Sequence, residues 1–522
     1  MKLTKLVVSL AALGLSHCVL ASADFSFSKQ SSSDAVGNTP SHVIFIDDVD
    51  NLDGAASIIN RASNGELTKL IELNDFTGEA GSTLHLQMIA GVESVLVVGS
   101  KHDGSLTKTD LQNLGGVIAA SLSSTKKDVD TTVHIDNLNT EIDAPSAFVA
   151  QGYHLRHYSF DKYKSVKDDG QSKVNFVNAD ADSASALYNN DLKYVAQGVH
   201  LARDFATEPG KSLYPEVFAD SIKATFKGVD NIKVRVLDVD DMEKLNMGAH
   251  LGVGNGSIND PNLIIVEYMA GEKDDAPIVL AGKGITFDTG GISLKNNDGM
   301  WAMKADLSGA AAVAGAMHAI ANRGDKVNVV GLMGMAENMP SQDAIRPGDV
   351  LETMKGTTIE IISTDAEGRL VLSDTVYYAQ QEYSPKLLLN IATLTGSAAR
   401  ALSDEYAALV TRNFDFSSEI MQVGERSGEH VWPLPLHPNH FDQIKSPIAD
   451  IKNSGAGNPG ASIGAAVIGT FVDEDLPWVH LDIAGVDWLS SEIDVAPKGS
   501  QGWGVRFMDQ LVRDYADKDL SR

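Results

Sequence analysis

The chain has 522 residues, of which 43% are hydrophobic, and a formal net charge of −28 from 70 acidic and 42 basic side chains. A chain of this length can bury more than one core, so two domains are expected. A surface this acidic repels phosphate backbones and anionic lipid, which argues against nucleic acids and membrane surfaces as partners.

The first residues have the pattern of a secretory signal peptide. Lys2 and Lys5 precede an apolar run over residues 6–15. Ala21, Ser22 and Ala23 have the small side chains of a cleavage site. The run is shorter than the about 20 residues that cross a bilayer, although a short anchor or a buried strand is an alternative. We therefore expect residues 1–23 to be removed and the protein to be exported, periplasmic or secreted, with no membrane attachment after cleavage.

Cleavage would also remove Cys18, the only cysteine of the chain. The mature chain would then have no disulfide and no thiolate that could act as a nucleophile or metal ligand. Loss of the two lysines would change the net charge from −28 to −30.

Residues 24–40 are polar and rich in serine, so a flexible lead-in is expected there. Residues 41–181 alternate between β-branched runs and helical patterns, which indicates a smaller N-terminal α/β domain. The expected elements are strands at 43–46, 94–99 and 132–135 and a helix at 108–121.

A helix is expected over residues 182–206, because Ala, Leu, Val and Tyr recur with helical spacing until Pro209 and Gly210 follow. This helix would link the smaller domain to a second α/β domain, residues 207–522, with a mixed, largely parallel central sheet. The expected strands are 233–237, 263–269, 277–282, 327–333, 358–362, 387–391 and 479–483, with helices at 307–321 and 370–381.

Residues 363–372, STDAEGRLVL, lie at a turn between a β-branched run and a helical pattern. Asp365 and Glu367 project to one side in extended backbone, and two hard oxygen ligands suit a divalent cation. Arg369 keeps its proton and could hold an anion beside that cation. A capped turn with a surface salt bridge is an equally good interpretation of this stretch alone, because acidic side chains favour a helix N-terminus.

A second stretch, residues 277–295, begins as a buried strand and ends in a glycine-rich loop that carries Lys283, Asp288 and Lys295. Asp306 follows at the start of a helix of small residues. Open α/β sheets bind ligands beyond the carboxyl ends of their strands. We therefore expect Lys283, Asp288, the acidic pair of the first stretch and residues 393–396 to lie just past strand ends and to converge on one site.

Together these stretches resemble the leucyl (cytosol) aminopeptidase family of two-metal exopeptidases. The likeness covers roughly residues 195–510 and is most specific in the TDAEGRL block. It rests on residues 392–396 and 478–485 and on four motifs in the same order and spacing: GKGITFDTGGISLK, MKADLSGAAAV, ENMPSQDAIRPGDV and STDAEGRLVLSDTV. This chain has Ser363 where the family commonly has Asn, which implies a shorter reach at that position.

The resemblance implies an aminopeptidase with two divalent cations per chain, Zn²⁺ or Mn²⁺ first and Co²⁺ or Mg²⁺ as alternatives. A hydroxide shared by the cations would attack the first peptide carbonyl, and one cation would take the free N-terminus of the peptide. The implied roles are Asp288 and Glu367 bridging both cations, Asp365 on one, Asp306 and Lys283 on the other, Lys295 at the oxyanion, and Arg369 holding a bicarbonate base.

The resemblance also implies a substrate pocket and an assembly. The pocket residues would be Met303, Thr393, Leu394, Gly396 and Ala461, and the assembly would be a homohexamer. From its chemistry alone, Lys283 would instead polarise a carbonyl, because an amine can ligate a metal only when its pKa is depressed.

Two other classes of function stay open. Residues 460–464, GASIG, fit the G-x-S-x-G elbow of serine hydrolases, with Ser462 as the nucleophile and His480 as a partner. An elbow follows a buried strand, however, and residues 451–459 have the composition of a loop. A catalytically inactive binding relative is the other alternative, although the ligand residues are all present. The 14 histidines form no H-E-x-x-H motif, which argues against a single-zinc protease.

Overall fold

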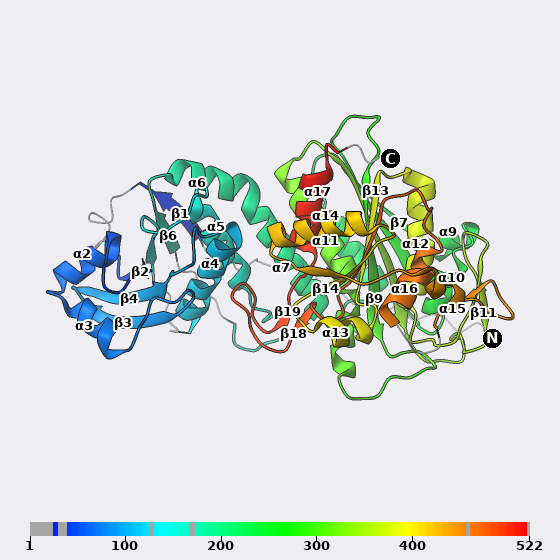
Figure 1. The fold of residues 1–522 in the computed structure, drawn as a ribbon. Coiled ribbons are helices and arrows are strands. Elements are labelled where there is room, and N and C mark those ends of the chain that lie inside the picture. Colours follow the sequence, from blue (N-terminus) through cyan, green and yellow to red (C-terminus); the bar gives the residue numbers. More distant parts are fainter. Residues whose placement is uncertain (1–23, 30–38, 125–128, 168–172, 456–459, 519–522) are drawn as a thin grey trace, which may run out of the picture.

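The computed structural model describes residues 24–29, 39–124, 129–167, 173–455 and 460–518. These residues form two α/β parts joined by a long helical segment (Figure 1). The N-terminal part is the smaller, and the larger part has a mixed sheet whose centre is parallel, so the expected fold class is confirmed. Within the described ranges, every helix is too short or too polar to cross a bilayer.

The smaller part is one six-stranded sheet with helices on both faces. Its elements are β1 Asp24–Ser28, β2 Ser41–Ile46, β3 Thr83–Ile89, β4 Val92–Gly99, β5 Thr131–His134, β6 Lys173–Val177, α2 Gly54–Ala62, α3 Glu66–Leu73, α4 Lys108–Ser123 and α5 Pro145–Arg156. The strand order is β1-β6-β5-β2-β4-β3, and β3 is antiparallel to its neighbour. Alternate residues of β2 enter two cores, since Val43 and Phe45 pack with α4 and α5 whereas Ile44 and Ile46 pack with α2 and α3.

The prediction of a flexible lead-in over residues 24–40 is wrong for its first residues. Asp24–Ser28 form β1, which pairs in parallel with β6. Phe25 packs edge-on against Tyr153 with the ring centroids 5.4 Å apart. The two phenylalanines of this strand supply packing that the serine-rich composition concealed.

One helical segment runs from the smaller part into the larger one. It consists of α6 (Ala181–Leu187), a π-helical turn (Tyr188–Leu192) and α7 (Lys193–Thr207). The helix expected over residues 182–206 corresponds to this segment.

The larger part is built on an eight-stranded sheet. Its strands are β7 Ile232–Leu237, β8 Asn262–Met269, β9 Ile278–Asp288, β10 Asn328–Asn338, β13 Leu387–Ala392, β14 Ala407–Val410, β15 Val431–Pro433 and β17 Trp478–Asp482. The order is β15-β14-β17-β13-β9-β10-β8-β7. The four central strands β17, β13, β9 and β10 are parallel to one another, and antiparallel pairings flank them.

Helices cover both faces of this sheet. One face carries α7 with α8 (Pro215–Thr225), α11 (Ser308–Arg323), α14 (Phe414–Ser427) and α17 (Val505–Tyr515), and the other carries α10 (Gly248–Gly254), α12 (Gly368–Tyr383) and α16 (Gly460–Gly469). Ile278 and Leu280 of β9 pack on the first face and Val279 and Ala281 on the second. The remaining helices are α9 Val239–Lys244, a 3₁₀ helix Met300–Leu307, α13 Gly396–Leu402 and α15 Pro438–Gln443.

The strand before the STDAEGRL turn lies outside the central sheet. This strand, β12 (Thr358–Glu360), pairs with β11 (Val350–Glu352) and β16 (Ile451–Lys452) in a separate three-stranded sheet. The acidic pair of the turn therefore reaches the site from beside the central sheet and not from beyond one of its strands. A β-branched run predicts a strand but carries no information on which sheet the strand joins.

A loop late in the chain is held by arginines of α5 and α7. Strands β18 (Trp488–Leu489) and β19 (Gly499–Ser500) form a hairpin around it. Arg156 of α5 donates to two carbonyl groups of the loop, residues 490–498, at 3.0 and 2.7 Å, and Arg203 of α7 donates to a third at 3.1 Å. The position of this hairpin therefore depends on both parts of the molecule.

Helix α7 crosses α11 at two glycines. A Cβ on Gly198 would lie 2.3 Å from the carbonyl oxygen of Gly315, and a Cβ on Gly315 would lie 2.4 Å from that of Gly198. We predict that Gly198→Ala lowers the free energy of unfolding by about 1–3 kcal/mol, because the helices must separate. Gln197→Ala is the control and should change it by less than about 0.5 kcal/mol. Denaturant unfolding measures both, and equal effects would contradict the close approach.

Candidate metal centre and substrate cavity

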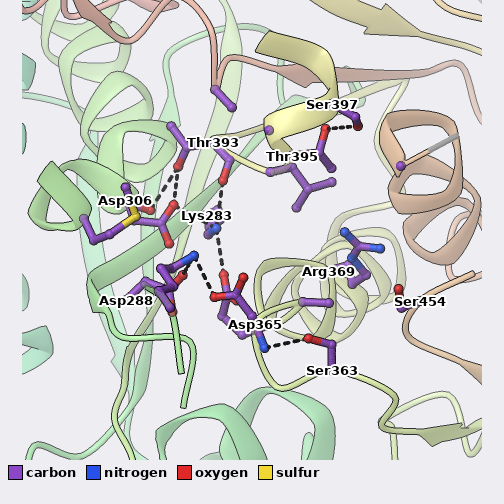
Figure 2. Close-up of a pocket in the computed structure, with 18 of the residues that line it drawn as sticks. Lys283, Asp288, Asp306, Ser363, Asp365, Arg369, Thr393, Thr395, Ser397 and Ser454 are labelled. Carbon is purple, nitrogen blue, oxygen red and sulfur yellow. Dashed lines mark hydrogen bonds and ion pairs between the residues drawn. The ribbon is translucent and has the colours of Figure 1, made fainter. Parts of the chain in front are cut away.

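Lys283 lies at the centre of the site, inside β9 and not past its end as expected. Its side chain is 3% exposed, and its ammonium lies 2.9 Å from Asp306 Oδ1 and 2.8 Å from Glu367 Oε1. It also donates to the carbonyl of Thr393 at 2.8 Å. Figure 2 shows Lys283 with Asp306 and Thr393 on one side of the cavity. The three donors of this ammonium thus have three oxygen partners.

Lys295 joins a second pair of carboxylates. Its ammonium lies 2.8 Å from Asp288 Oδ2 and 2.6 Å from Asp365 Oδ1. Asp288 is the last residue of β9, and its Oδ1 accepts from Gly290 N–H and from Asn338 Nδ2, both at 2.8 Å. Gly290 has φ +87°, and a Cβ there would lie 2.7 Å from Asp365 Oδ1. The turn after β9 therefore needs glycine at this position.

Four carboxylates and two lysines leave this cluster with excess negative charge. Burial, together with the charge of Glu367, raises the pKa of Asp288 to about 6. Burial also raises the pKa of Asp306 well above its usual value. On Glu367 burial acts in the same direction, but Lys283 and Lys295 outweigh it and lower the pKa of that carboxyl. The charges of the two lysines therefore do not neutralise the four carboxylates.

The geometry of the carboxylates fits divalent cations. Oδ2 of Asp306 and Oε2 of Glu367 are buried and have no hydrogen-bond partner within the described chain. Oxygen atoms of Asp288, Asp365 and Glu367 lie within 4.8 Å of one another. Buried carboxylate oxygens without donors are costly, and divalent cations take such oxygens as ligands. These four residues could therefore hold metal ions.

Arg369, in the first turn of α12, borders the same cavity and is 7% exposed. Its Nη1 donates to the carbonyl of Asn453 at 3.0 Å, while its Nε is buried without a described partner. Burial lowers the pKa of the guanidinium, which still stays charged at neutral pH. A buried cation with an unused donor suits a small anion.

The two lysines, the four carboxylates and Arg369 all border one cavity of about 570 Å³, part of which is shown in Figure 2. Met303, Thr393, Leu394 and Gly396 line it too. Ala461 differs from the prediction that it lines the substrate pocket. It packs with Ala398 and Ala408 in a small apolar cluster instead. Gly460 and Ile463 of the same helix, α16, border the cavity, whereas Ala461 points into the apolar cluster.

Two residues that hold loops of the site were not among those predicted. The amide of Asn453 accepts from a backbone N–H at 2.8 Å and donates to the carbonyl of Ser363 at 2.7 Å. Asp482, at the end of β17, accepts from Leu394 N–H at 3.0 Å and from Thr395 Oγ1 at 2.6 Å. Asn453 directly follows β16 and Asp482 is the last residue of β17, so the sequence signal for each was a polar residue at the end of a strand. The Oγ of Ser363 accepts from the N–H two residues later at 3.3 Å.

Ser462 does not form a serine hydrolase site. It lies inside α16, is 3% exposed, and its hydroxyl donates to the carbonyl of Pro435 at 2.7 Å. Nδ1 of His480 in β17 is hydrogen-bonded to Asn390 at 2.7 Å. No hydrogen bond joins Ser462 to His480 in the described structure, so the nucleophile–base arrangement is not formed.

The carboxylates of the site, held on an α/β fold, are those of a metal-binding protein. The sequence profile of the cytosol aminopeptidase family, N-terminal domain, matches residues 43–167, and that of the catalytic domain matches residues 200–508. The chain belongs to the cytosol aminopeptidase family of two-metal peptidases and is a metal-dependent aminopeptidase.

Curated relatives and solved structures agree with this family. Probable cytosol aminopeptidases of Nitrobacter hamburgensis and Rhodopseudomonas palustris are each 40% identical to this chain, over 483 and 482 residues, and each match covers 91% of this chain and 95% of the relative. The structure of a tomato leucine aminopeptidase mutant is 27% identical with a TM-score of 0.83, covering 94% of this chain and 96% of that one. The bottromycin maturation enzyme BotP in complex with Mn is 28% identical with a TM-score of 0.79, covering 95% and 100%.

The relatives correct the expectation of an exported protein. They are named cytosol aminopeptidases, so the prediction of a periplasmic or secreted protein is wrong. That prediction rested on lysines beside a short apolar run at residues 6–15, a pattern that also occurs in other N-terminal segments. The proposed signal peptide, residues 1–23, lies outside the described residues.

We predict that Asn453→Ala loosens the turn at residues 363–369, because backbone groups of the turn lose a buried donor and a buried acceptor. The free energy of unfolding of the metal-free protein should fall by about 1–3 kcal/mol. Asn439→Ala is the matched control, since Asn439 is exposed and only its backbone makes a described hydrogen bond. Thermal unfolding measures both, and an unchanged midpoint for Asn453→Ala would show that this side chain does not hold the turn.

Proposed function

We propose that this aminopeptidase releases leucine and similar residues from peptides with a free N-terminus, using two divalent cations per chain. The observation that carries the proposal is a pair of buried carboxylate oxygens beside Lys283, one on Asp306 and one on Glu367, that have no hydrogen-bond partner among the described residues. Carboxylates with one amine suit Zn²⁺ or Mn²⁺ first, with Co²⁺ and Mg²⁺ as alternatives. The Mn complex of the similar enzyme BotP supports Mn²⁺.

The contacts divide the proposed ligands into two overlapping sets. Asp288, Asp365 and Glu367 are close enough together for one cation. Lys283, Asp306 and Glu367 are in direct contact and would hold the other. Glu367 belongs to both sets, and by the family likeness Asp288 would also contribute to holding both cations. Burial acts to lower the pKa of Lys283, but its carboxylate neighbours outweigh burial and raise it, so a metal ligand role requires a cation to displace the proton.

Two cations bound here would lower the pKa of a water molecule and polarise the peptide carbonyl. The free N-terminus of the substrate would lie near Asp306, and Lys295 would donate to the carbonyl oxygen as negative charge develops on it. Burial acts to lower the pKa of Lys295, but Asp288 and Glu367 outweigh it and raise the pKa, so Lys295 remains a proton-bearing donor. Arg369 would hold a bicarbonate that serves as the base.

The remaining assignments extend the family likeness to this chain. Met303, Thr393, Leu394 and Gly396 would contact the first residue of the substrate. The chain would divide into an N-terminal domain (41–181), a linker helix (182–206) and a catalytic domain (207–522). Six copies would assemble, as the family likeness implies.

Release of leucine from leucine amide tests the proposal. Activity should disappear in a chelator and return with Mn²⁺ or Zn²⁺ at two bound cations per chain, and N-acetylated leucine amide should not be cleaved. Ser462→Ala should remain active, because this hydroxyl is engaged with a backbone carbonyl. Activity that survives chelation and falls in Ser462→Ala would contradict the proposal, and inactivity with every metal would indicate an inactive binding relative.

We predict that Lys295→Gln lowers kcat by about 10²–10³-fold, because the developing oxyanion loses a charged donor. Metal content should stay at two cations per chain, because Lys295 pairs with Asp288 and Asp365 but is not itself a proposed metal ligand. Lys283→Met should instead reduce the number of bound cations. Steady-state kinetics and metal analysis distinguish these roles, and loss of metal in Lys295→Gln would show that this lysine only holds the carboxylates.

A further inference from the structure

A fifth carboxylate borders the cavity and has no part in the mechanism above. The acidic residues that line the cavity are Asp288, Asp306, Asp365, Glu367 and Asp487, and only the first four are proposed metal ligands. Asp487 precedes β18 and is 7% exposed. A carboxylate this buried is costly unless a partner or a ligand compensates it.

Asp487 forms no ion pair within the described residues. Its Oδ2 lies 3.1 Å from the hydroxyl of Ser308, and the single proton of that hydroxyl has a nearer acceptor, the carbonyl of Ala305 at 2.6 Å. Burial raises the pKa of Asp487 to about 7, as expected for a carboxyl without a charged partner. The capacity of Asp487 to pair with a cation is therefore unused.

The lysines on this side of the cavity are engaged elsewhere. Lys283 contacts Asp306 and Glu367, and its charge lowers the pKa of Asp487 less than burial raises it. Lys304 donates to a backbone carbonyl at 2.7 Å, and its ammonium lies 5.5 Å from the centre of the Trp488 ring. Arg369 and Arg400 also line the cavity, but within the described residues neither forms an ion pair with Asp487, so a cation that pairs with Asp487 would come from a ligand.

Asp487 lies on the side of the cavity where the first residue of a substrate would bind. Ser308, its hydrogen-bonding neighbour, follows the proposed ligand Asp306 by two residues. Met303 and Trp488 line the cavity as well. Apolar walls together with a carboxylate suit a side chain that has an aliphatic stem and a cationic end.

We propose that Asp487 makes the enzyme prefer peptides whose N-terminal residue is lysine or arginine, by pairing with the cation of that side chain. The inference rests on the proposed function, because it uses the placement of the substrate N-terminus near Asp306. Leucine remains a substrate, since the apolar walls accept it, whereas a lysyl residue gains an ion pair in addition. Buried polar groups that need a partner give a site its largest discrimination between similar substrates.

Lysine amide and norleucine amide test this, because they share the same aliphatic stem and differ in the ammonium. For the Mn²⁺-loaded enzyme at about pH 8, where lysine is protonated, we expect kcat/KM to be about tenfold or more higher for lysine amide. Asp487→Asn should bring the ratio to about one, with the norleucine value changed less than about threefold. Asp298→Asn is the matched control, since it removes the same charge from an exposed residue outside the cavity lining and should keep the wild-type ratio.

A wild-type ratio near one, or an unchanged ratio in Asp487→Asn, would overturn the inference. Hydrolysis of norleucine amide would still support the aminopeptidase in either case, whereas no hydrolysis of either amide would overturn the proposed function as well. The wild-type ratio needs no variant, so misfolding of Asp487→Asn would not prevent the test. Asp487→Glu keeps the charge and should retain a preference for lysine.

Discussion

A buried ammonium group joins four segments of the larger domain that are far apart in the chain. Lys283 comes from β9, Asp306 from the 3₁₀ helix before α11, Glu367 from the start of α12, and Thr393 from the loop after β13. Space around it is also restricted, since a Cβ on Gly368 would lie 2.9 Å from Nζ. Buried charges are tolerated only as a paired and hydrogen-bonded group, and losing one partner leaves an unpaired charge behind. The chemistry of the site and the positions of these segments therefore depend on one another.

The excess of carboxylates makes the site a cation receptor before any substrate is bound. Two lysines hold four carboxylates in place and fix their geometry, but in the described part of the chain one oxygen of Asp306 and one of Glu367 have no partner. Ligands that bind only the folded chain stabilise it by mass action, so metal loading and folding stability are thermodynamically linked here. Arg369 and Lys295 also line the cavity and add positive charge to it, although neither is a proposed metal ligand.

Much of the fold and most of the cavity residues could be predicted from the sequence. Apolar β-branched runs identified the central strands, and charged residues in glycine-rich loops identified the side chains that converge. The sequence missed features that depend on distant pairing. Strand β9 continues past Gly282 because Gly284 and Ile285 pair with Met335 and Ala336 of β10, and this pairing places Lys283 inside a strand. The membership of β12 in a separate sheet, and the inward direction of Ala461, likewise follow from tertiary packing and not from local sequence.

The loop at residues 490–498 links the wall of the cavity to α5 of the smaller domain and to α7 of the helical segment that joins the two parts. Arg156 and Arg203 fix this loop, and Asp487 and Trp488 lead into it from the cavity wall. Substitutions in α5 or α7 could therefore shift the shape of the wall without altering any residue that touches metal or peptide. In evolutionary terms, positions in α5 and α7 offer a way to change selectivity while the residues of the reaction itself are preserved.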